Sequence, residues 1–204
     1  MVDLCCLILL AIPLFFYWIQ KRNTAKMNVN YQQLANQLKM GFNPEHGFEG
    51  TLMSGEIGEF NHRCRAYFQR TRSTSRKTRD FHLVITVSFL KPLTLGLEIK
   101  PQGFLYEGLT FGSPRGKDIK IGHPEFDSNF RISGFEDDKV RQFLDQDRMQ
   151  AMMLLKETMP WYNSIVINDE GISTGLPGLV DDPNYIGSVM FQLVALASKI
   201  EKLG

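Results

Sequence analysis

A chain of 204 residues has room for one domain or little more, and with 43% hydrophobic and 22% charged residues its composition is that of a globular protein. This composition excludes disorder for the bulk of the chain. The formal net charge of +1 hides an asymmetry: residues 1–91 hold 12 Lys and Arg against 6 Asp and Glu (net +6), whereas residues 92–204 hold 11 against 16 (net −5). Of the three cysteines only Cys64 lies outside the first apolar segment, so a disulfide framework is excluded within the folded part, and a reducing compartment is favoured.

The first predicted element is a hydrophobic helix over Leu4–Ile19, a segment without a charged residue. Its 16 residues would span about 24 Å as a helix, which is short for a hydrocarbon core of roughly 30 Å. Aromatic and basic residues follow at the positions typical of a membrane interface, namely Tyr17, Trp18, Lys21 and Arg22. We therefore predict that residues 1–22 form an uncleaved transmembrane signal-anchor.

The charges that flank this segment predict its orientation. Lys21, Arg22 and Lys26 follow it, and only Asp3 precedes it, so the positive-inside rule predicts a single-pass protein of the cell inner membrane with its domain on the cytoplasmic side. A cleaved signal peptide, a lipoprotein signal and a buried core helix are the alternatives. They are less favoured because the segment has no basic start, no small-residue cleavage site and no amphipathic face.

After a tether over residues 23–29, one α+β domain is expected over residues 30–204. Apolar residues at helical spacing predict a short helix over 30–40. From Phe48 to Ser133 the pattern is typical of strands separated by glycine-containing turns, and the β-branched, aromatic run Phe81–Phe89 is the clearest of them. In His62–Gln69 apolar and polar residues alternate, as in a strand with one exposed face. The short connections favour an antiparallel meander.

The last third of the chain returns to helices. Helical spacing over Glu136–Glu157 predicts a helix with a break near Asp145–Asp147, and a small hairpin is expected around Asp169-Glu170. Asp182 and Pro183 are typical of a helix start, so they predict a terminal helix with a broad apolar face. The predicted fold is an antiparallel sheet of about six to eight strands with the two C-terminal helices packed on one side.

The most distinctive polar feature is a basic stretch whose core, RTRSTSRKTR, is predicted to connect two strands as a long hairpin loop. One interpretation is a solvated loop without a partner. A second is contact with anionic lipid headgroups, and a third is contact with an acidic protein patch or, less favoured, nucleic acid, for which interleaved aromatic residues are few. The candidate contact residues are Arg63, Arg65, Arg70, Arg72, Arg76, Lys77 and Arg79.

No catalytic, cofactor-binding or metal-ligating set is predicted. His62 and Cys64 would share a strand face, but two ligands do not make a zinc site. The segment from Gly122 to Asp127 (GHPEFD) contains groups suited to acid–base chemistry, yet its Pro124 and turn context favour a motif that shapes the chain. Phosphate-loop, dinucleotide and nucleophile-elbow motifs are absent from the sequence.

The order of motifs in the second half resembles uncharacterised bacterial families of unknown function that carry an N-terminal membrane anchor. The residues that carry this resemblance are Gly122-His123-Pro124-Glu125-Phe126-Asp127, Phe130, Ile132, Val140, Phe143-Leu144 and Asp169-Glu170-Gly171. The resemblance implies a bacterial inner-membrane protein and implies no activity. We interpret its matching positions structurally: Phe126 and Phe130 as core aromatics, and Asp127 as an acceptor for turn amides.

Two classes of function follow from the sequence. The first is a membrane-tethered interaction or regulatory module that binds a protein or lipid surface, and the alternative is a membrane-anchored, hydrolase-like enzyme whose site the sequence does not reveal. The sequence favours the interaction module over the enzyme. A deep pocket with converging polar groups would favour the enzyme, whereas a shallow surface with an exposed basic or apolar patch would favour the module. No cofactor is expected, and the oligomeric state is left open.

Overall fold

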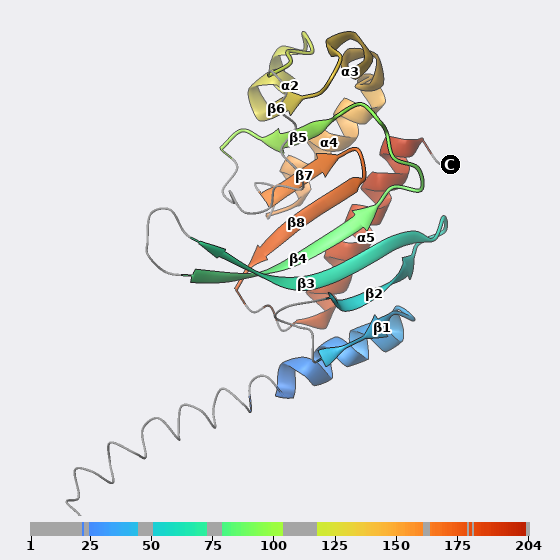
Figure 1. The fold of residues 1–204 in the computed structure, drawn as a ribbon, viewed down its shortest axis with the longest axis vertical. Helices are drawn as coiled ribbons and strands as arrows, with labels where there is room; N and C mark the ends of the chain where they lie inside the picture. The colour runs from blue at the N-terminus through green and yellow to red at the C-terminus, as the bar shows by residue number, and fades with distance from the viewer. Residues whose placement is uncertain are drawn as a thin grey trace, which may run out of the picture.

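The centre of the molecule is an eight-stranded antiparallel sheet in a computed structural model that describes residues 22, 25–44, 51–72, 79–103, 118–160, 164–178, 180 and 182–202. The strand order is β1-β2-β3-β4-β8-β7-β5-β6 (Figure 1). The strands are β1 (Gly41–Phe42), β2 (Thr51–Ile57), β3 (His62–Arg72), β4 (Arg79–Ser88), β5 (Glu98–Pro101), β6 (Phe130–Ser133), β7 (Ile165–Asn168) and β8 (Gly171–Pro177). The α+β class and the antiparallel sheet agree with the prediction.

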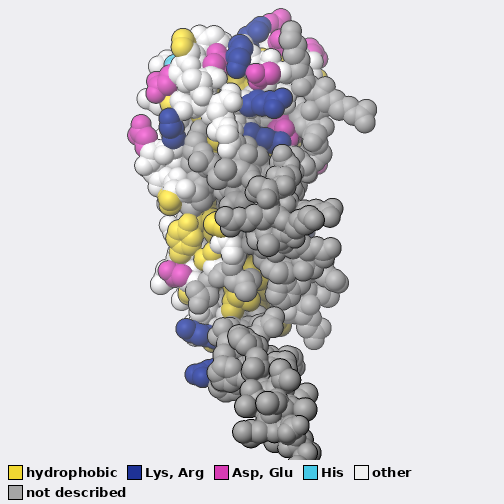
Figure 2. All heavy atoms as spheres, turned by 90° about the vertical axis from the view of Figure 1, so that its left-hand side faces the viewer, with side chains coloured by type: hydrophobic (Ala, Val, Ile, Leu, Met, Phe, Trp, Pro, Cys, Tyr) yellow, Lys and Arg dark blue, Asp and Glu magenta, His cyan; other side chains and the backbone are white. Residues whose placement is uncertain are grey.

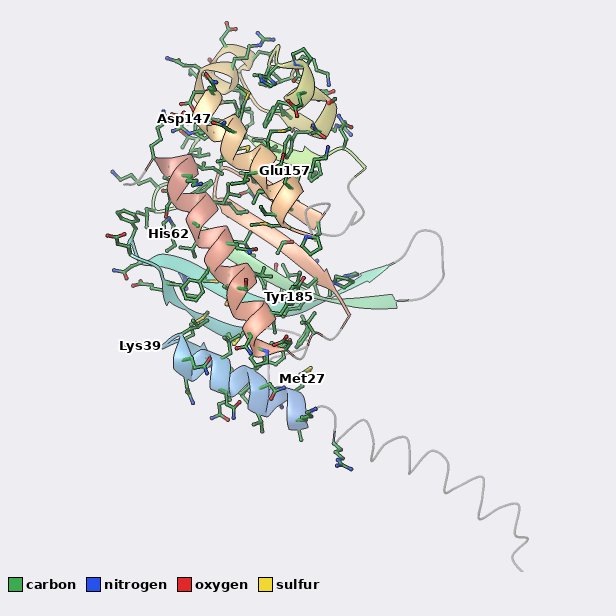
Figure 3. All side chains as sticks on the ribbon, turned by 180° about the vertical axis from the view of Figure 1, so that it is seen from behind. Met27, Lys39, His62, Asp147, Glu157 and Tyr185 are labelled. Carbon is green, nitrogen blue, oxygen red and sulfur yellow. The ribbon has the colours of Figure 1, made fainter. Side chains whose placement is uncertain are left out.

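Helices cover one face of this sheet. A helix over residues 25–37, α4 (Gln146–Thr158) and α5 (Pro183–Glu201) lie behind the sheet in Figure 1 and in front of it in Figure 3, while α2 (Pro124–Asn129) and α3 (Asp137–Phe143) lie at the β6 end. α5 packs on the two central strands β4 and β8. The main core therefore lies between α5 and the sheet.

Local capping explains where the C-terminal helices begin. The Asp182 carboxylate accepts hydrogen bonds from the amides of Asn184 (2.9 Å) and Tyr185 (3.3 Å), and Pro183 occupies the first helical position, as predicted. The predicted break between two helices is also confirmed, because Asp145 caps α4 by accepting from the Arg148 amide at 3.1 Å. The apolar face of α5 is buried along its whole length.

The alternation predicted for β3 is present. Cys64, Ala66 and Phe68 are buried on the helix-covered face, whereas Arg63 and Arg65 between them are exposed. Successive side chains of a strand point to opposite faces, so one strand contributes both to the core and to the open surface.

The predicted meander is correct only for its first four strands. After β4, the neighbouring strand in the sheet is β8, and β7 stands between β8 and β5, so the last hairpin is inserted into the middle of the sheet. β4 has a strand partner on each edge, β3 and β8, and side chains on both of its faces are buried, namely Leu83, Val84, Ile85 and Val87. The pairing of β4 with β8 joins segments far apart in the chain, which a local pattern does not reveal.

The turn of this inserted hairpin holds the connection from β4 to β5. One Asp169 carboxylate oxygen accepts from the amides of Leu95 (3.1 Å) and Leu97 (2.9 Å), and the other accepts from the Gly96 amide at 2.7 Å. Gly96 has a positive φ of 63°, and the Phe135 ring lies where its Cβ would be. The carboxylate thus fixes a backbone bend that leads the chain into β5.

The structure corrects the prediction of a transmembrane helix. Among the residues that the structure describes, no helix is both long enough and apolar enough to cross a membrane. The long helix α5 is instead amphipathic and packs on the sheet. The apolar segment Leu4–Ile19, with the predicted interface residues Tyr17 and Trp18, and Lys21 lie outside the described residues, and Arg22 is exposed.

The boundary of the predicted tether also differs. Residues 25–29 are helical and continue into the helix over 25–37, rather than forming an extended linker. The reason is packing: Met27 is buried together with Tyr31, Leu34 and Ala35 of the same helix. The helical spacing that the sequence shows from Tyr31 onward therefore begins one turn earlier.

Candidate functional site

The face of the sheet opposite α5 carries exposed polar residues on β2 and β3 and buried residues, among them Val84, Val166 and Ser173, on the central strands, and the ladder register shows which residues share it. One row runs from Ser54 through Arg65 and Thr86 to Ser173. Beside it, Glu56 is opposite Arg63 on β2 and β3, and Ser88 is opposite Gly171 on β4 and β8. Tyr67 stands on the same face of β3, and Arg131 stands opposite Lys100 on β6 and β5. We call this surface the arginine face and define it by Arg63, Arg65, Tyr67, Thr86, Ser88 and Arg131.

The arginines of this face have no acidic partner among the residues that the structure describes. Arg63, Arg65 and Arg131 are exposed, and none of them forms an ion pair or a side-chain hydrogen bond with a residue in the described ranges. Glu56 is the cross-strand neighbour of Arg63 and is exposed, but the two form no ion pair. Three guanidinium groups are therefore available to an external anion, and each can offer a carboxylate two parallel donors.

Arginines on the helices are arranged differently. Arg141 forms ion pairs with Asp137 (3.7 Å) and Asp138 (3.3 Å), and Arg148 bonds Asp145 at 2.9 Å. Around α2 and α3, at the top of Figure 2, basic and acidic side chains are interspersed. The unpaired arginines are thus a property of the arginine face rather than of this chain's surface in general.

Tyrosine and hydroxyl side chains complete the arginine face. Tyr67 is half-buried two residues from Arg65, and burial raises the pKa of its phenol, while the neighbouring Arg65 charge lowers it. Thr86 and Ser88 of β4 are partly exposed beside the two arginines of β3. Side chains of this kind offer apolar contact area as well as hydrogen-bond donors.

The lysine of β5 does not add a free charge to this surface. Lys100 Nζ lies 2.8 Å from Glu98 Oε1, and both side chains are largely buried. An ion pair of this kind neutralises its two members locally. The free positive charge of the arginine face therefore comes from β3 and β6.

The structure places the seven basic residues of the prediction in three groups. Arg63 and Arg65 lie on the arginine face. Arg70, Arg72 and Arg79 lie where β3 and β4 continue beyond the rest of the sheet, and only their backbone is described; Arg76 and Lys77 lie outside the described residues. Positions 70 and 72 also have the opposite parity to 63 and 65 along β3. The predicted loop over residues 70–79 is shorter than expected at both ends, because β3 continues to Arg72 and β4 begins at Arg79.

Sequence reasoning missed Arg131. It lies in the edge strand β6, which β4, β8, β7 and β5 separate from β3, and it stands on the same sheet face as Arg63 and Arg65 only through the strand order. The available signal was the alternation of Arg131 with Phe130 and Ile132, which are buried on the opposite face.

The ionisable and nucleophilic side chains of the core have structural roles. His62 Nε2 lies 2.8 Å from Glu201 Oε2, and Glu201 Oε1 accepts from the Leu90 amide at 2.8 Å, so this buried pair attaches the end of α5 to the sheet. Burial raises the pKa of the Cys64 thiol to about 12, which keeps it protonated and unreactive at neutral pH. Within the described ranges no three His, Cys, Asp or Glu side chains are grouped as metal ligands would be.

The GHPEFD segment also shapes the chain, as predicted. His123 Nδ1 accepts from the Phe126 amide at 3.2 Å and caps α2, and the Asp127 carboxylate accepts from the amides of Ile121 and Gly122, each at 2.9 Å. Phe126 and Phe130 are buried with their ring centroids 4.6 Å apart. These residues build the β6 end of the core.

Comparison with protein-family models, curated proteins and solved structures found no match. The resemblance to uncharacterised bacterial families stays a prediction. The fold and the site define an α+β domain with one helix-covered and one arginine-bearing sheet face.

Proposed function

We propose that this protein is an interaction module that binds an acidic protein surface through the arginine face. One observation carries the proposal: Arg63, Arg65 and Arg131 are exposed on one sheet face without ion-pair partners in the described structure, whereas Arg141 and Arg148 on the helices are paired. An exposed cation without a partner adds little to folding stability, so its placement on a rigid face is better explained by binding.

The composition of the face favours a protein partner. Arginine and tyrosine are enriched at protein–protein interfaces and at their binding hot spots, where a rigid aromatic ring and a guanidinium group bury large area at a low entropic cost. The arginine face combines both residue types, with Tyr67 beside Arg65 on the same strand. A β-sheet holds these side chains at fixed spacing, so little ordering is needed when an acidic surface approaches.

Charge reversal on the arginine face tests the proposal. The full chain and its Arg65→Glu variant are titrated with a synthetic oligoglutamate peptide, and Lys199→Glu on α5 serves as the matched control, because Lys199 is exposed and lies on the other side of the sheet. We expect Arg65→Glu to weaken binding at least about fivefold, which corresponds to roughly 1 kcal/mol. Lys199→Glu should leave binding within about twofold of wild type, and higher salt should weaken the wild-type complex.

Two outcomes would contradict the proposal. Equal losses in Arg65→Glu and Lys199→Glu would show a response to overall charge rather than to a site. Tighter binding to anionic phospholipid vesicles or to duplex DNA than to the peptide at the same salt concentration would show that the partner is not an acidic protein surface.

A further inference from the structure

The outward face of α5 carries no charged side chain along most of its length. From residue 183 to residue 198 the sequence contains no Asp, Glu, Lys or Arg. Phe191 is 51% exposed in the middle of this face, and Tyr185 is 37% exposed nearer the start of the helix. In Figure 3, where α5 lies in front of the sheet, Tyr185 is labelled. We call this surface the α5 strip and define it by Tyr185, Ser188, Phe191, Gln192 and Ala195.

Other helical surfaces of the molecule are charged. On α3, Arg141 pairs with Asp137 and Asp138, and Lys202, just past α5, lies 2.7 Å from an Asp145 carboxylate oxygen. The exposed face of a surface helix is ordinarily where charged and polar residues collect. At the centre of protein–protein interfaces, by contrast, charged residues are depleted and aromatic residues are enriched. The α5 strip therefore has the composition of an interface centre.

Charges of opposite sign stand at the two ends of the α5 strip. Asp182 is exposed where the helix begins, and Lys199 is exposed in its last turn. Neither residue forms an ion pair within the described part of the chain, because Asp182 accepts only from the two amides that it caps. The two residues are separated by about 26 Å along the helix, and the midpoint between them lies next to Phe191.

Antiparallel packing of two copies of α5 matches these charges. If a two-fold axis passes through the midpoint, Lys199 of each copy lies opposite Asp182 of the other. A two-fold contact places the same surface on both copies, so a charge near the axis would meet a like charge, and the α5 strip has none there. Parallel packing would instead bring Lys199 to Lys199. The charge pattern thus fits a second copy of this chain in one orientation.

We propose that the α5 strip is the contact surface of a homodimer. In this dimer two α5 helices pack antiparallel with Phe191 at the two-fold axis, and Asp182 and Lys199 form two ion pairs between the copies. A contact made by one helix pair buries a small interface area, so the dimer should be weak and reversible. The α5 strip and the arginine face lie on opposite sides of the sheet, so the dimer would present two arginine faces to two acidic sites at once.

Sedimentation equilibrium of the full chain tests the dimer. We expect the average mass to rise from the 23.4 kDa of one chain toward twice that value as the concentration increases from about 1 to about 100 µM. Phe191→Glu should raise the dissociation constant at least about tenfold, because it places two carboxylates together at the axis. Lys199→Glu should raise it at least about threefold, because each ion pair becomes a like-charge pair.

Arg65→Glu is the matched control for these variants. It reverses a charge on the opposite face of the sheet, so the dissociation constant of the dimer should stay within about twofold of wild type. Urea unfolding of Phe191→Glu should give the wild-type midpoint, because the replaced ring is exposed. In the other direction, Phe191→Glu should leave binding of the oligoglutamate peptide within about twofold of wild type.

Disulfide trapping separates antiparallel from parallel packing. Position 192 lies beside the expected axis, whereas two cysteines at position 199 would be about 24 Å apart along the helices, too far for a disulfide. Both variants carry Cys5→Ser and Cys6→Ser, and Cys64 is buried. Under mild oxidation Gln192→Cys should cross-link two copies at least about tenfold faster than Lys199→Cys.

Four results would overturn the inference. They are a chain that stays monomeric at about 100 µM, a dissociation constant that Phe191→Glu leaves unchanged, an equal loss of association in Arg65→Glu, and faster cross-linking of Lys199→Cys than of Gln192→Cys. The inference and the proposed function fail separately, because one is read from the mass of the protein alone and the other from binding of an acidic peptide.

Discussion

The two faces of the sheet differ in what covers them, although the same strands supply both. On one face Cys64, Ala66 and Ile85 are buried in the helix-covered core, and on the other Arg63 and Arg65 are exposed and unpaired within the described structure. Because side chains alternate along a strand, each of these strands contributes to stability through one set of positions and to the open surface through the other. Substitutions at adjacent positions of one strand should therefore differ in their effect on the free energy of unfolding.

The largest difference is expected between adjacent positions of β4. Ile85→Ala should lower the free energy of unfolding by about 3 kcal/mol, because it leaves a cavity under α5. Thr86→Ala, on the arginine face, should lower the free energy of unfolding by less than about 1 kcal/mol, because the threonine side chain is partly exposed and buries less surface. Urea unfolding of both variants measures the difference, and equal losses would contradict the division between the faces.

A second comparison separates the paired arginines from the unpaired ones. Arg148 Nε donates to Ile200 O at 2.6 Å, a terminal NH of its guanidinium donates to Phe143 O at 3.0 Å, and the group stacks on the Phe143 ring. Arg148→Gln should therefore cost about 2 kcal/mol, because buried carbonyls lose their donors. Arg65→Gln should change stability by less than about 0.5 kcal/mol. A large loss from Arg65→Gln would mean that the arginine face is structural.

The smallest expected effect is the contribution of Cys64 to the pH dependence of the free energy of unfolding. Burial raises the pKa of its thiol from 9.0 to about 12, so above pH 9 the unfolded chain releases a proton that the folded chain retains. The stabilisation is fully present below pH 9 and is lost as the pH rises toward 12. Relative to Cys64→Ala, wild type should lose about 1.4 kcal/mol between pH 8 and pH 10 in urea unfolding. An unchanged difference would place the thiol in contact with solvent.

Several features of the fold were predictable because their causes are local. The start of α5 follows from Asp182 and Pro183, the break before α4 from Asp145, and the two faces of β3 from strict alternation of apolar and polar residues. The contacts of Asp127 with turn amides were predictable for the same reason. Each involves residues within about one helical turn or one strand.

Other features depend on contacts between distant segments. The insertion of β7 and β8 between β4 and β5 depends on which edge of β4 remained open, and the position of Arg131 on the arginine face follows from that strand order. The hydrogen bonds from Leu95, Gly96 and Leu97 to Asp169 join two connections that no spacing relates. The hydropathy of the N-terminal segment predicted a spanning helix, which the described helices do not include.

The sequence by itself determined the class of the fold, the caps of its C-terminal helices and the alternation that places arginines opposite the core. These depend on interactions between near neighbours in the chain, whose geometry the backbone restricts. Only the tertiary structure decided the strand order, the exposure of Arg63, Arg65 and Arg131 without acidic partners among the described residues, and the length by which β3 and β4 extend beyond β2 and β8. Strand pairing joins any two compatible edges at similar energy, so the choice among them is made by packing of the whole core.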